Sequence, residues 1–67
     1  MCQSTVYLIA GDQEEEVMRE VTRLVPVEGG VQLETFFEEP RFVPGRVAEV
    51  DFLRHTVTLV PLQERGE

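Results

Sequence analysis

The sequence of 67 residues predicts an all-β protein, a small barrel of about six short strands. Apolar and polar residues alternate on both sides of Gly29-Gly30, which is typical of a hairpin. Glycine and proline punctuate the chain at intervals of strand length. The apolar pattern also changes face near Val47, as it does where a bent strand turns the corner of a barrel. Strands are expected near 3–10, 14–18, 20–27, 31–37, 40–51 and 56–62, within a single domain, 1–67.

The first expected strand, 3–10, is rich in β-branched and aromatic residues and apolar on both faces. One face carries Thr5, Tyr7 and Ile9. A strand that is apolar on both faces is either central or covered by another subunit. We therefore expect this face, or its neighbours, to contribute to a homodimer interface.

The segment after this strand is ambiguous. Asp12 followed three residues later by Glu15 is typical of a helix N-cap, and helical spacing of apolar residues follows. The β-branched residues at 21–27 favour strand instead. We expect a short strand near 14–18, and a helix over 13–19 remains the alternative.

The second half of the chain gives clearer signals. Residues 31–37 alternate after the glycine pair. Over 40–51 the change of face predicts a bulge near Val47, with Gly45 making room for it. Asp51 is expected to cap the turn into the last hairpin.

The composition restricts both stability and function. Burial of apolar surface contributes about 100 kcal/mol in a chain of this size, and ordering the chain costs about as much. The single cysteine excludes a disulfide within the chain, so a metal or a partner subunit is expected to help. The net charge of −7 disfavours nucleic acid and anionic membranes. A lone thiol, no signal peptide and no membrane-length apolar run predict a cytoplasmic protein.

No arrangement of residues indicates an enzyme. The one histidine, His55, excludes a two-histidine site within one chain and is expected to lie exposed in a turn, with a role as a fourth metal ligand left open. Glu49 and Asp51 share a strand face and could pair as acid and base, but no pocket partner is apparent. The runs of glutamate at 14–16 and 38–39 are explained by a solvated strand edge and a turn.

Cys2 is the exception to this lack of candidate sites, because several atoms that can donate to a metal ion are close to it in the sequence. The amine of Met1 and the amide nitrogen and thiolate of Cys2 can close two adjacent five-membered chelate rings. Such strong-field donors suit a planar ion such as Ni(II).

Four segments carry a resemblance to a known family: residues 1–8 (MCQSTVYL), 14–18 (EEEVM), 31–33 (VQL) and 45–55 (GRVAEVDFLRH). In order and spacing they resemble the CooT family of small nickel-binding proteins, with one departure at 37–39, where a glycine would be expected. The resemblance implies an SH3-like or Sm-like fold, a homodimer, and Ni(II) held at Cys2 with Met1. It also implies delivery of nickel to an enzyme such as carbon monoxide dehydrogenase. A metal-free module that binds a protein or peptide is the alternative.

Overall fold

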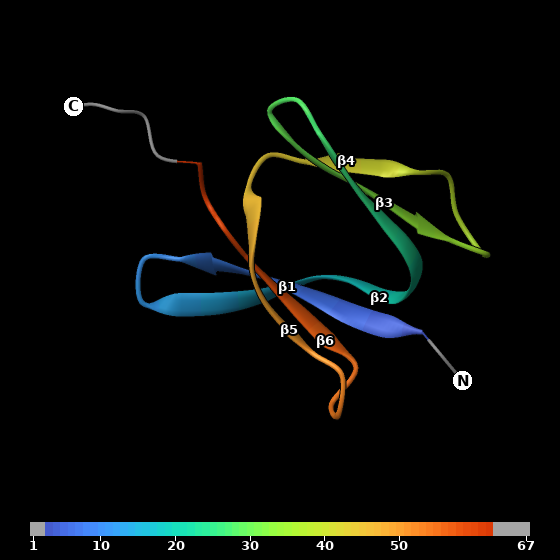
Figure 1. Cartoon of the computed structure of the whole chain (residues 1–67), viewed down its shortest axis with the longest axis horizontal. Coiled ribbons are helices and arrows are strands. Elements are labelled where there is room, and N and C mark those ends of the chain that lie inside the picture. Colours follow the sequence, from blue (N-terminus) through green and yellow to red (C-terminus); the bar gives the residue numbers. More distant parts are fainter. Residues whose placement is uncertain (1–2, 63–67) are drawn as a thin grey trace.

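The computed structural model describes residues 3–62, which form one six-stranded sheet and no helix (Figure 1). The sheet order is β4-β3-β2-β1-β6-β5, and every neighbouring pair is antiparallel except β1 and β6. The predicted all-β class is confirmed. Within 3–62 there is no helix long and apolar enough to cross a membrane. The strands are β1 (Ser4–Ala10), β2 (Gln13–Val27), β3 (Gly30–Thr35), β4 (Arg41–Val43), β5 (Arg46–Asp51) and β6 (Thr56–Val60).

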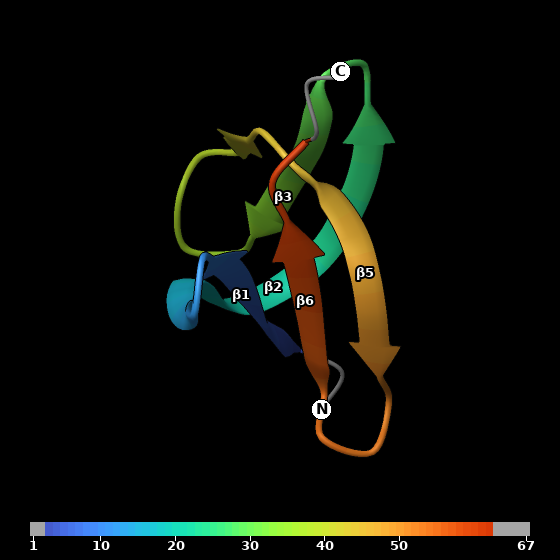
Figure 2. The same cartoon turned by 90° about the vertical axis from the view of Figure 1, so that its left-hand side faces the viewer.

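The barrel predicted from the sequence is not closed, because the sheet of residues 3–62 curls strongly but its two end strands are not paired with each other. Its two end strands are β4 and β5, although only Pro44 and Gly45 separate them in sequence. Figure 2 shows the sheet curling so that this short connection joins its two ends. Because β4 has only three residues and is followed by Pro44, which has no N–H group, it offers little edge for further pairing.

The long strand β2 corrects the prediction for the ambiguous segment. The two strands expected at 14–18 and 20–27 are one extended strand, and the segment 13–19 is not helical. Its first half pairs with β1 and its second half with β3. The change of partner occurs where Glu20 has a φ of 57°, which bends the strand without interrupting it. Pairing on both sides therefore overrides the local helix signal.

The glycine pair makes the predicted hairpin between β2 and β3. Gly29 has a φ of 84°, a conformation that glycine adopts without strain. Gly30 is buried, and a Cβ placed on it would overlap the carbonyl oxygen of Val43. The first glycine thus forms the turn, and the second lets β4 approach β3.

The predicted strand at 40–51 is divided into β4 and β5 at the proline–glycine step. The expected bulge is present in β5, where the pairing with β6 shifts between Val47 and Glu49. Gly45 also makes room as expected, because a Cβ there would lie 2.9 Å from the carbonyl oxygen of Val60. The bend therefore has the predicted cause, but it also breaks the strand.

The core is small and formed by aliphatic side chains from every strand except β5. Large apolar side chains remain on the surface, most of all in the β3–β4 loop and the β5–β6 turn. The buried residues are Val6, Met18, Val21, Val31, Leu33, Val43 and Leu59.

Candidate functional site

The start of β1 lies next in sequence to the residues predicted to bind metal. Met1 and Cys2 themselves lie outside the residues that the structure describes. The backbone N–H of Thr5 donates a hydrogen bond to the carbonyl oxygen of His55 at 3.0 Å. Thr5 also begins the parallel pairing of β1 with β6, opposite Thr56. The strand that follows the candidate ligands is therefore fixed against the β5–β6 turn.

The β5–β6 turn is itself well built. The Oδ1 atom of Asp51 accepts hydrogen bonds from the backbone N–H groups of Leu53 and Arg54, both at 3.0 Å. This confirms that Asp51 caps the turn. His55 closes the turn with a φ of 57°, a left-handed conformation that is uncommon for residues other than glycine. Its carbonyl group holds β1, while the residue as a whole is exposed, as expected.

The structure also places Glu49 and Asp51 in a cavity that the sequence did not reveal. This cavity has a volume of ≈ 280 Å³ and lies on the outer face of the sheet, over β2, β1, β6 and β5. The cavity results from the register of the strands, because Tyr7 lies opposite Thr58 and Thr58 lies opposite Glu49. These contacts join distant parts of the sequence, so no local pattern could predict them. The cavity is lined by Tyr7, Glu14, Glu49, Asp51, Arg54, Thr56 and Thr58.

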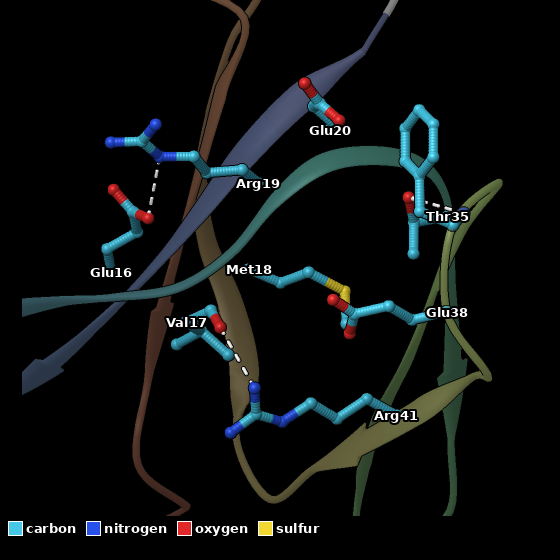
Figure 3. A pocket seen from close by; sticks show the side chains of 9 residues that line it. Glu16, Val17, Met18, Arg19, Glu20, Thr35, Glu38 and Arg41 are labelled. Atoms are coloured by element: carbon cyan, nitrogen blue, oxygen red, sulfur yellow. Dashed lines mark hydrogen bonds and ion pairs between the residues drawn. The ribbon is translucent and has the colours of Figure 1, made fainter.

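A second cavity, of ≈ 370 Å³, lies beside the bend of β2 (Figure 3). Its charged groups are partly paired: Arg19 Nε donates to Glu16 Oε2 at 2.8 Å, and Arg41 Nη1 donates to the carbonyl oxygen of Val17 at 3.1 Å. Figure 3 shows the thioether of Met18 pointing toward the cavity between these groups. The mixture of paired charges and an apolar floor gives no set of metal ligands.

No group of three or more histidine, cysteine, aspartate or glutamate side chains within 3–62 is arranged to hold a metal ion. His55 does not line the outer cavity that contains these carboxylates.

Comparison with known proteins identifies the family. The sequence matches the family described as CO dehydrogenase accessory protein CooT over residues 1–60. The chain belongs to the CooT family. The resemblance drawn from the sequence is therefore confirmed, and so is the expectation that the chain is not an enzyme, because the family consists of accessory proteins.

A solved structure supports the fold of the family. A crystal structure from Carboxydothermus hydrogenoformans, assigned as CooT, superposes with a TM-score of 0.82. The match covers 92% of this chain and 100% of the other, with 24% sequence identity. At this identity the likeness shows the fold alone. Among curated proteins, none matches the sequence.

Proposed function

We propose that the chain is a nickel-binding metallochaperone that delivers Ni(II) to a nickel enzyme such as carbon monoxide dehydrogenase. The observation that carries this proposal is the match to the CO dehydrogenase accessory family, which begins at residue 1 and so includes Met1 and Cys2. An accessory protein without enzymatic chemistry of its own can serve a metalloenzyme by handing it the metal.

Ni(II) is the cargo in this proposal, and Cys2 is its principal ligand. The Met1 amine and the Cys2 amide nitrogen and thiolate supply donors of the type that planar Ni(II) prefers. Two features support a site at this end of the chain. No alternative cluster of metal ligands exists within 3–62, and the hydrogen bond from Thr5 to His55 gives the ligand-bearing segment a fixed base.

A homodimer would allow two chains to share one ion. Thr5, Tyr7 and Ile9, the expected interface residues, are all half-buried in one chain and keep surface for a second copy to cover. If two first strands pair across this face, two Cys2 thiolates could bind one Ni(II) per dimer, whereas two ions per dimer would indicate separate chelates. Glu14 and Glu49 line the cavity beside Tyr7, so salt that screens their repulsion should strengthen the dimer. Sedimentation at micromolar concentration and at two salt concentrations measures both the mass and this trend.

The decisive experiment is a competition titration of Ni(II), Zn(II), Cu(I) and Co(II) against the wild type and Cys2→Ser. We expect tight nickel binding only in the wild type, with an unchanged β fold in the variant. The affinity should rise with pH, since an amine of pKa about 8 and a thiol of pKa about 8.5 must both lose protons to bind the metal. His55→Ala, which leaves its backbone hydrogen bond to Thr5 available, is the matched control and should bind nickel like the wild type.

If Cys2→Ser binds nickel as tightly as the wild type, the metallochaperone function is wrong. The protein would then be better described as a metal-free interaction module. The proposal also places the protein in the cytoplasm, because a free thiol ligand persists in a reducing compartment.

A further inference from the structure

The tip of the β5–β6 hairpin exposes two adjacent apolar side chains. Phe52 is 83% exposed and Leu53 is 94% exposed, the two highest values among the large apolar residues of the surface. Both figures show this hairpin projecting beyond the rest of the sheet (Figures 1 and 2). Neither side chain can contribute much to the core, so their apolar character needs another explanation.

The backbone that carries them is fixed. Asp51 holds the N–H groups of Leu53 and Arg54, and the carbonyl of His55 is bound to β1. A turn held in this way keeps its backbone in one conformation, so little backbone entropy is lost when its side chains bind a partner.

The β3–β4 loop exposes Phe36 and Phe37 but is held less well. The N–H of Phe37 donates to the Oγ1 atom of Thr35 at 3.5 Å, which is long for a hydrogen bond. This loop lies away from the β5–β6 hairpin in both views, so the two apolar groups are separate surfaces (Figures 1 and 2). The hairpin tip is therefore the better candidate for docking.

The charge around the tip restricts what can bind there. At the base of the hairpin the outer cavity is lined by three carboxylates, those of Glu14, Glu49 and Asp51, against one guanidinium, that of Arg54, and the whole chain has a net charge of −7. The dimer proposed above uses the face of Thr5, Tyr7 and Ile9, whereas Phe52 and Leu53 do not line the cavity on that face, so the tip is left to a different partner. A partner with basic residues around an apolar cleft would be attracted, at long range and in the complex.

We propose that Phe52 and Leu53 dock this protein onto the CO dehydrogenase that it serves, by inserting into an apolar cleft with a basic rim. The inference rests on the proposed function, because it assigns the surface through which the accessory protein meets its enzyme. The hydrogen bond from Thr5 to His55 joins this docking turn to the start of β1. Docking through the tip therefore also orients the strand that follows the nickel ligands toward the enzyme.

The test measures binding of the full chain to purified, nickel-free CO dehydrogenase by biolayer interferometry. The double variant Phe52→Ser, Leu53→Ser should bind at least about tenfold more weakly than the wild type, as expected when an apolar anchor is removed. Phe36→Ser, at a position that is 80% exposed in the β3–β4 loop, is the matched control and should bind like the wild type. Wild-type binding should weaken as sodium chloride is raised. Far-UV circular dichroism checks that both variants keep the fold.

Four outcomes would overturn the inference, and the first three are unchanged binding by the tip variant, an equal loss in Phe36→Ser, and binding that does not weaken with salt. A tip variant that sediments as a monomer, where the wild type is a dimer, would show that a second copy covers the tip and would overturn it too. Nickel titration separates this inference from the proposed function. The tip variant should bind nickel normally, and Cys2→Ser should bind the enzyme normally. If the tip variant fails to bind the enzyme while Cys2→Ser binds nickel, docking is correct and the nickel site is wrong.

Discussion

The same substitution at two leucines provides a quantitative test of the fold. Leu33 in β3 is fully buried, with 0% of its surface exposed, whereas Leu53 at the hairpin tip is 94% exposed. Replacement of leucine by alanine removes three carbons, which lowers the free energy of unfolding by about 2.4 kcal/mol in transfer alone, at ~0.8 kcal/mol for each carbon. At Leu33 the cavity left behind raises the loss to about 3–4 kcal/mol. At Leu53, where only a small part of the side chain is buried, the same replacement lowers the free energy of unfolding by less than about 0.3 kcal/mol.

Thermal unfolding followed by circular dichroism should separate the two variants clearly. For a chain of this size each kcal/mol shifts Tm by about 4–8 °C, so Leu33→Ala should unfold at least about 12 °C below the wild type. Leu53→Ala should unfold within about 2 °C of it. Since a chain of this size is expected to have only about 3–10 kcal/mol of stability, Leu33→Ala removes a large share.

Two results would contradict this reasoning. A loss below about 1 kcal/mol at Leu33 would mean that β3 does not carry the core. A loss at Leu53 equal to that at Leu33 would mean that the hairpin tip packs against the protein, and would also remove the basis for docking through it.

Three further predictions follow from particular contacts. Asp51→Ala should lower the free energy of unfolding by about 1–2 kcal/mol, because two hydrogen bonds of the turn are lost. Hydrogen exchange at the backbone N–H of Leu53 should accelerate in this variant, and Asp51→Asn, which keeps an acceptor oxygen, should lose less stability. Gly30→Ala should lower stability by about 2–3 kcal/mol in urea titration, since its Cβ would overlap the Val43 carbonyl; a loss below about 0.5 kcal/mol would mean that β4 does not pack there. A tag at the N-terminus should weaken nickel binding by converting the Met1 amine to an amide, while a C-terminal tag should not; equal effects would exclude the amine as a ligand.

Local signals in the sequence predicted the parts of the fold that depend on local chemistry. The Gly29-Gly30 hairpin, the bulge after Val47 and the Asp51 cap each depend on residues within a few positions of one another. The predicted strands at 31–37 and 56–62 also exist, each ending two residues earlier, at Thr35 and Val60.

Features that depend on the partner of each strand could not be predicted in this way. The single long strand β2 exists because β1 pairs with its first half and β3 with its second. The break between β4 and β5 follows from their positions at opposite ends of one curled sheet. The acidic outer cavity arises from the register of four strands, although Glu49 and Asp51 were recognised as sharing a face. The candidate ligands Met1 and Cys2 stay a prediction, because they lie outside residues 3–62.

The parallel pairing of β1 with β6 connects the two functional proposals. Parallel neighbours cannot be joined by a tight turn, so the chain passes through four other strands between them. As a result Thr5, near one end of the sequence, is hydrogen-bonded to His55, near the other. A ligand-bearing segment without contacts to the rest of the fold would have no fixed orientation when the protein binds its enzyme. Here the start of β1 is hydrogen-bonded to the turn that carries Phe52 and Leu53, so under the two proposals one contact surface would both bind the enzyme and direct the start of β1, which follows the proposed ligands, toward it.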